Sequence, residues 1–149
     1  MILRDFIKIF KPEANQNIQI FVGGWRQTFH DFKNISPILL NKEIISIDLI
    51  IPIFIDVIIP RISITIDPYK TDITSKPITV RELIKIAGLE ESEYKRVWLR
   101  TIDGFLSSLS DKLELMDTEI IKIASDGQSI TLAINYNMLK EEYNNEEHK

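Results

Sequence analysis

The spacing of hydrophobic and polar residues predicts that the chain begins with a short helix and a β-hairpin. Residues 2–10 carry apolar side chains at helical spacing with charged side chains between them, which is typical of a short amphipathic helix. In residues 17–30 the apolar positions alternate with other residues instead, as they do along a half-buried strand. Gly23 and Gly24 interrupt this alternation and supply the backbone freedom that a two-residue hairpin turn needs.

Prolines then divide a very apolar segment. Ser36 followed by Pro37 is typical of a helix start, and predicts a short helix there. Three strands are expected between the next prolines, at residues 43–51, 53–59 and 61–67. Residues 1–67 therefore predict an α+β module with short helices and an antiparallel or mixed sheet.

A polar segment with two prolines, residues 68–77, is expected to be a linker. Beyond it, Thr79 and Glu82 form a capping-box pattern, and Gly88 stands where a helix would end. A longer second helix is expected from about Glu91 to Lys112.

The expected second helix has a broad apolar stripe that includes Trp98, so we expect Trp98 in the core. Two strands joined at Asp126-Gly127 then predict a second hairpin, and residues 137–149 form a polar tail. No internal repeat is evident in the sequence.

Residues 80–99 resemble the helix-turn-helix motif of DNA-binding proteins. With Gly88 at the turn, apolar residues occupy the positions where the two helices of that motif meet: Leu83, Ala87, Leu89, Tyr94 and Val97. The hairpin that follows is placed like the wing of a winged-helix domain, so the resemblance extends over residues 79–136. It implies a DNA-binding regulator that uses Lys95, Arg96 and Arg100 on phosphates, with duplex DNA as the partner.

The negative charge at the start of the expected second helix favours a different interpretation of residues 78–113. Glu90, Glu91 and Glu93 stand where a recognition helix would meet the bases, and DNA phosphates would repel them. Acidic residues do suit a helix N-terminus, where they interact favourably with the helix dipole. Residues 78–113 can therefore be a plain helical hairpin with an acidic contact surface that binds protein.

Composition narrows the function classes further. The net charge is −4, which argues against broad attraction to nucleic acid or to an anionic membrane. The chain has no Cys and only two His, and no catalytic or cofactor motif is present, so we expect no metal, no cofactor and no enzymatic activity. The most apolar run, residues 49–60, is too short to span a bilayer, and we expect a cytoplasmic protein.

Residues 1–67 also resemble small uncharacterised proteins of phages and mobile elements. The shared features are the opening MILRDFIKIF, a strand such as NIQIFVGG and a run such as EIISIDLIIP. The resemblance implies a setting in which many small acidic proteins inhibit host defence nucleases, as anti-CRISPR proteins do.

These observations lead to two hypotheses. The first is a non-enzymatic protein that binds and modulates another protein, such as a nucleic-acid-binding enzyme, with carboxylates that mimic phosphates. The second is the winged-helix regulator, as a homodimer. Trp25, at the hairpin corner, can either pack on the sheet or anchor an interface. The residues expected to contact a partner are Glu90, Glu91, Glu93, Lys95, Arg96, Arg100 and Trp25.

Overall fold

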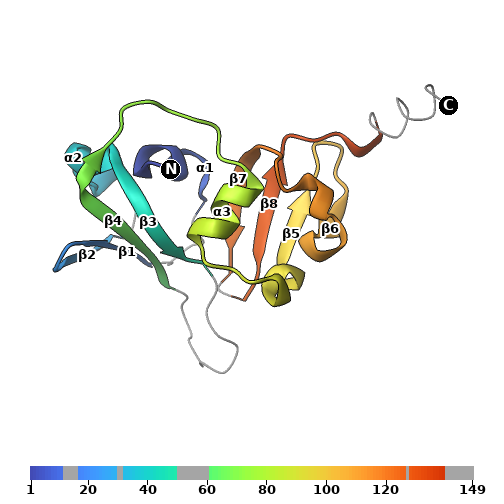
Figure 1. Cartoon of the computed structure of the whole chain (residues 1–149), viewed down its shortest axis with the longest axis horizontal. Coiled ribbons are helices and arrows are strands. Elements are labelled where there is room, and N and C mark those ends of the chain that lie inside the picture. The colour runs from blue at the N-terminus through green and yellow to red at the C-terminus, as the bar shows by residue number, and fades with distance from the viewer. Residues whose placement is uncertain (12–16, 30–31, 50–60, 127, 140–149) are drawn as a thin grey trace.

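The described residues form two four-stranded sheets that lie side by side, and the short helices at residues 3–9 and 80–86 lie between them (Figure 1). The computed structural model describes residues 1–11, 17–29, 32–49, 61–126 and 128–139 of the 149-residue chain. The helices are α1 (Leu3–Ile9), α2 (Pro37–Leu40) and α3 (Val80–Ile86), with 3-10 turns η1 (Phe32–Asn34), η2 (Glu91–Arg96), η3 (Leu109–Asp111) and η4 (Leu113–Leu115). The strands are β1 (Asn17–Val22), β2 (Trp25–Phe29), β3 (Lys42–Asp48), β4 (Arg61–Thr71), β5 (Val97–Arg100), β6 (Leu106–Ser108), β7 (Ile120–Ser125) and β8 (Ile130–Ile134).

The first sheet has the strand order β2-β1-β4-β3. The expected hairpin is confirmed: β1 and β2 are antiparallel, and Gly23 has a φ of 59° at the turn. The two central strands, β1 and β4, are parallel, whereas β3 and β4 are antiparallel, so the sheet is mixed. The strand expected at residues 53–59 lies outside the described residues.

The second sheet repeats this arrangement, with the order β6-β5-β8-β7. Again the first two strands form an antiparallel hairpin, the two central strands are parallel, and the last two strands are antiparallel. The register shift in β3, between Ile44 and Ser46, recurs in β7 between Ile120 and Lys122. The same irregularity at the same place shows that the two sheets share more than their strand order.

The structure therefore contains an internal repeat, which corrects our expectation that none is present. Each repeat begins with a helix that follows an isolated bridge to its own sheet, Ile2 with Glu43 and Thr79 with Glu119. A backbone hydrogen bond next to each of these bridges also recurs. Ile44 N–H donates to Met1 O at 2.9 Å, and Ile120 N–H donates to Ile78 O at 2.7 Å.

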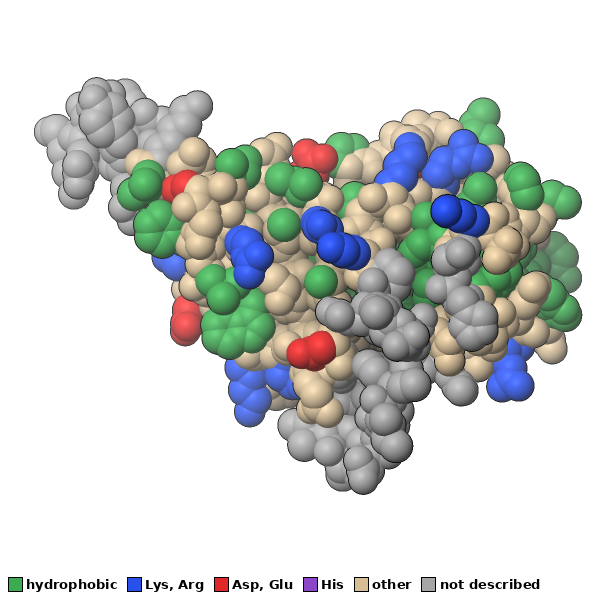
Figure 2. All heavy atoms as spheres, turned by 180° about the vertical axis from the view of Figure 1, so that it is seen from behind, with side chains coloured by type: hydrophobic (Ala, Val, Ile, Leu, Met, Phe, Trp, Pro, Cys, Tyr) green, Lys and Arg blue, Asp and Glu red, His purple; other side chains and the backbone are tan. Residues whose placement is uncertain are grey.

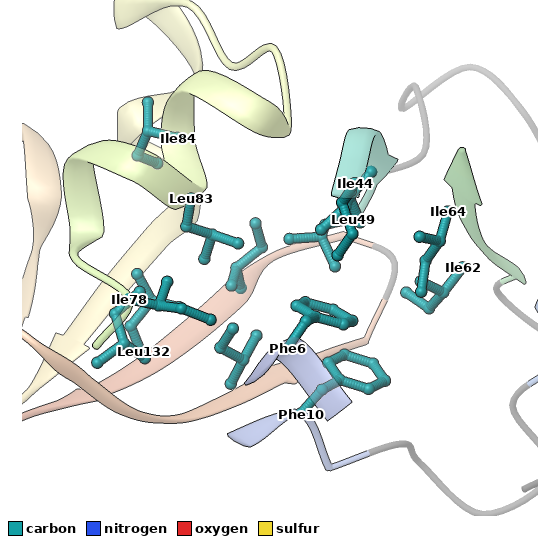
Figure 3. Close-up of a cluster of buried hydrophobic side chains, with 14 of the residues drawn as sticks. Phe6, Phe10, Ile44, Leu49, Ile62, Ile64, Ile78, Leu83, Ile84 and Leu132 are labelled. Atoms are coloured by element: carbon teal, nitrogen blue, oxygen red, sulfur yellow. The ribbon is translucent and has the colours of Figure 1, made fainter. Parts of the chain in front are cut away.

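The two repeats share one hydrophobic core. Helix α1 contacts β7 of the second sheet as well as β3 of its own, and α3 contacts β3 of the first sheet. Phe6 is fully buried and stacks on Phe10 at 5.1 Å between ring centroids. Figure 3 shows these two rings between side chains of the first sheet and Leu132 of the second. The Ser125 hydroxyl also joins the halves, because it donates to Leu49 O at 2.6 Å.

The expected winged-helix arrangement is wrong. Only the first of its two helices forms: α3 begins with the predicted Thr79 cap, whose Oγ accepts from Glu82 N–H at 3.2 Å, and Gly88 follows it with a φ of 65°. The segment expected as a helix over residues 91–112 instead forms η2, two strands and η3. Two mixed sheets with a few short helices remain compatible with the α+β class, but not with a helical hairpin followed by a wing.

The physical reason for this error lies in Val97 to Arg100. These four residues alternate buried and exposed, with Val97 and Leu99 fully buried and Trp98 38% exposed. An alternation with period two and a β-branched residue favours a strand over a helix. Gly104, with a φ of 89°, belongs to the loop between β5 and β6.

Other expected elements are present with changed limits. The helices expected at the N-terminus and after Ser36 are α1 and α2, although Ser36 makes no side-chain capping bond. The second hairpin, β7 with β8, is confirmed. Strand β4 extends to Thr71, into the segment 68–77 that we expected to be a linker. Most of the expected polar tail lies outside the described residues.

Candidate protein-interaction surface

The predicted contact residues do not form a single site. Trp25 lies at the start of β2 in the first sheet and is 49% exposed. The other six residues lie in the second repeat, with Glu90 just before η2 and the rest on η2 and β5. Lys95, Arg96 and Arg100 do not lie on a recognition helix, because the first two belong to η2 and the last belongs to β5.

The acidic residues are only partly available to a partner. Glu90 and Glu91 are exposed. The Glu93 carboxylate instead accepts a hydrogen bond from Glu90 N–H at 3.2 Å and so caps η2. Arg96 Nε donates to Gln128 O at 2.6 Å, which fastens η2 to the turn between β7 and β8. Acidic side chains thus stand at the start of η2 and basic side chains at its end, so that Glu90 and Glu91 are the exposed acids of this turn.

The outer face of the second sheet offers a more continuous surface. Because side chains alternate along each strand, Val97 and Leu99 point into the core and their neighbours Trp98 and Arg100 point outward. The strand registers place outward residues of the other strands beside them. We call this surface the Trp98 face; it comprises Trp98, Arg100, Leu106, Lys122, Ala124, Thr131 and Ala133.

The Trp98 face combines exposed apolar side chains with cations. Trp98 is 38% exposed and Leu106 is 52% exposed, and Leu106 pairs across the strands with Arg100. Its residues include no Asp or Glu, and neither Arg100 nor Lys122 forms an ion pair with any described residue. Figure 2 views the molecule from the side opposite to α3; the second repeat lies on the left, where hydrophobic side chains are seen among Lys and Arg side chains and a few Asp and Glu side chains.

The first repeat shows which of these features are special to the second. Trp98 pairs with Ser108 and Thr131, as Gln19 pairs with Thr28 and Ser63, so Trp98 and Gln19 are equivalent. Gln19 is 6% exposed. By the same registers, a set of mostly polar residues stands in place of the Trp98 face: Gln19, Phe21, Arg26, Ser46, Asp48, Ser63 and Thr65. The second repeat has thus exchanged a mostly polar face for a more apolar and cationic one.

The loop between β5 and β6 borders the Trp98 face and is well fixed. Thr101 Oγ donates to the Asp103 carboxylate at 2.5 Å and accepts from Phe105 N–H at 3.0 Å. Asp103 also accepts from the backbone N–H groups of Met138 and Leu139, at 3.2 and 2.8 Å. Desolvation works to raise the pKa of Asp103, but these hydrogen bonds outweigh it and hold the pKa below its ordinary value. The loop therefore presents exposed Phe105 at a defined position beside the face.

Sequence reasoning missed the Trp98 face because it placed Trp98 on a buried helical stripe. The signal that could have found it is the strand alternation of residues 97–100, which puts Trp98 and Arg100 on the same side.

Other kinds of site have less support in the part of the chain that the structure describes. No group of three His, Cys, Asp or Glu side chains there could hold a metal ion. A small hollow of about 40 Å³ lies between the N-terminus and α3, where Asp5 accepts from Lys76 N–H at 3.1 Å. Among the described residues no helix has the length and apolar character needed to cross a membrane.

Comparison of the chain with protein-family models, with curated proteins and with solved structures found no match.

Proposed function

We propose that the chain is a protein-binding module that holds its partner on the Trp98 face. The observation that carries this proposal is the difference between the repeats at one position, a half-exposed Trp98 in place of the buried Gln19. A large apolar side chain on an exposed strand face has a hydration cost, which burial against a partner removes. Tryptophan and arginine are also the residues that most often dominate the binding energy of interfaces.

The charge of the Trp98 face indicates the chemistry of the partner. Arg100 and Lys122 are its charged residues, in a chain whose net charge is −4. Opposite charges across an interface speed association and suppress wrong partners. We therefore infer a partner segment with an apolar side chain to cover Trp98 and carboxylates to meet Arg100 and Lys122.

Binding through the acidic turn of η2 has weaker support. Glu93 is engaged in capping, and Lys95 and Arg96 on the same turn offset the charge of Glu90 and Glu91. A carboxylate surface that mimics nucleic acid would need several free acids in a row. Modulation of a partner's activity is compatible with the Trp98 face and does not require such mimicry.

The test is to capture partners from the native host, identify them by mass spectrometry and measure the dissociation constant of each purified partner. Trp98→Gln introduces the residue that the first repeat carries at the equivalent position, so the strand should tolerate it. We expect the dissociation constant to rise by about 30-fold, the effect of losing a residue that dominates an interface. The matched control is Trp25→Gln, which removes an exposed tryptophan from the first sheet and should leave binding unchanged.

A partner that binds Trp98→Gln as tightly as the unaltered chain would exclude the Trp98 face. If Glu90→Ala with Glu91→Ala abolished binding instead, the acidic turn would be the site and the present proposal would be wrong.

A further inference from the structure

Strand β2 is an exposed edge of the first sheet. It is the outermost strand in the order β2-β1-β4-β3, and its residues from Trp25 to Thr28 are all exposed. The equivalent edge of the second sheet, β6, has only three residues and contacts η2, where buried Ser108 donates to Tyr94 O at 3.4 Å. An exposed edge strand is a template for pairing with another chain, which very short or covered edges avoid.

The two-residue turn determines which backbone groups of β2 point outward. Val22 and Trp25 flank the turn and pair with each other, and in an antiparallel pair the residues that exchange backbone hydrogen bonds alternate with those that do not. Trp25, Gln27 and Phe29 therefore bond to β1, while the N–H and C=O groups of Arg26 and Thr28 point away from the sheet. Within the described residues these outward backbone groups have no hydrogen-bond partner.

The outward edge of β2 is complementary to itself. When two copies of β2 run antiparallel about a two-fold axis at Gln27, Arg26 of each lies opposite Thr28 of the other. This register bonds both outward N–H and both outward C=O groups of each copy, because the two residues of each such pair exchange N–H···O=C bonds. A register centred on Arg26 or on Thr28 uses fewer of these groups, and one centred on Arg26 places two like charges together.

Side chains favour the same register. Trp25 shares a side of the sheet with its cross-strand neighbour Val22 and with the buried Phe29. In the paired arrangement it would lie across from Phe29 of the second copy, next to that copy's core. Half-exposed Trp25 is thereby covered by a partner, with no additional residue needed.

We propose that β2 pairs with β2 of a second copy of this chain, antiparallel and centred on Gln27, so that the first sheet continues across a homodimer. The Trp98 face lies on the other sheet of each copy and stays open. A contact built around one five-residue strand is small for a protein interface, so the dimer dissociates on dilution.

Charge changes at the β2 edge test this proposal by sedimentation equilibrium of the full chain over a wide concentration range. Thr28→Arg places an arginine opposite Arg26 of the other copy, and the two-fold axis repeats this pair. The like-charge repulsion should raise the dimer dissociation constant by about 10-fold. Adding Arg26→Glu to that variant places Glu opposite Arg in both pairs and should restore the dimer, which separates this effect from misfolding. Ser63→Arg, on the same face of β4 two strands from the edge, is the control that should leave the constant unchanged.

A chain that stays monomeric at all concentrations would overturn the proposal. So would a dimer that Thr28→Arg leaves intact, or a Thr28→Arg defect that Arg26→Glu does not repair. Loss of the dimer in Trp98→Gln would overturn it as well, because copies would then meet through the Trp98 face.

Discussion

Truncating Phe6 tests whether the two repeats fold as one unit. Phe6 is fully buried on α1, and α1 contacts both β3 and β7. Replacing a buried Phe by Ala removes the packing of the ring and leaves a cavity, which costs about 4 kcal/mol. For a chain of this size a urea m value of about 2 kcal/mol/M converts that loss to a fall of about 2 M in the unfolding midpoint.

The two tryptophans make this experiment specific, since Trp25 reports on the first sheet and Trp98 on the second. In a Trp25→Phe background fluorescence follows the second sheet, and in a Trp98→Phe background it follows the first. We expect Phe6→Ala to lower both midpoints by the same amount, because the core is continuous. Phe105→Ala removes a ring that is 44% exposed and serves as the control, with a much smaller shift.

Two separate transitions would refute this reasoning. If Phe6→Ala lowered the midpoint seen by Trp25 and left that seen by Trp98 in place, the repeats would be independent domains. Phe6→Leu, a milder change, provides the same comparison if Phe6→Ala fails to fold.

Three further predictions follow from local geometry. Thr79→Ala should lower the free energy of unfolding by about 1 kcal/mol, because Thr79 caps α3. Ser36→Ala should change it little, because Ser36 makes no side-chain capping bond to α2. Urea denaturation of the two variants measures both free energies. Gly88→Ala should lower the free energy of unfolding by about 1 kcal/mol because Gly88 has a positive φ, and Gly24→Ala should lower it less because Gly24 does not. At both positions an added Cβ meets no atom within 4 Å, so the difference measured by thermal unfolding reports the backbone conformation. The pKa of Asp103 is lowered in the folded chain, so its stabilisation is present above the ordinary Asp pKa of about 3.9 and is lost as the pH falls through the folded value. The protection of the Met138 and Leu139 amides, measured as their exchange rate relative to an unstructured peptide at the same pH, should fall over that range. Asp103→Asn should show the lower protection already at neutral pH.

The elements that the sequence predicted correctly are those specified by neighbouring residues. The Gly23-Gly24 hairpin, the Thr79 cap and the β7–β8 hairpin each depend on residues a few positions apart. The parallel pairs, β1 with β4 and β5 with β8, join segments far apart in the chain, and no local pattern encodes them. The false second helix arose because apolar residues between Tyr94 and Leu113 fit a helical stripe, although Val97 to Arg100 also fit a strand.

The internal repeat has a signal in the sequence, in two pairs of similar segments. RDFIKI at residues 4–9 and RELIKI at 81–86 fall on α1 and α3. EIISI at 43–47 lies within β3, and EIIKI at 119–123 begins one residue before β7. These two pairs are offset by nearly the same number of residues, from 4 to 81 and from 43 to 119, whereas the equivalent positions 63 and 131 in the central strands are closer together, so no single period holds along the whole chain. Recognising the pairs would have predicted two similar sheets, and the comparison of Trp98 with Gln19 would then have followed from the sequence.

Site-specific photo-crosslinking tests the central claim, that the Trp98 face holds the partner, most directly. A photoreactive residue is placed at Leu106 on the Trp98 face, at Arg26, its equivalent in the first repeat, and at Glu91 in the acidic turn. We predict strong crosslinks to a captured partner from position 106, and only background from positions 26 and 91. Crosslinks concentrated at position 91, with none at position 106, would contradict the account.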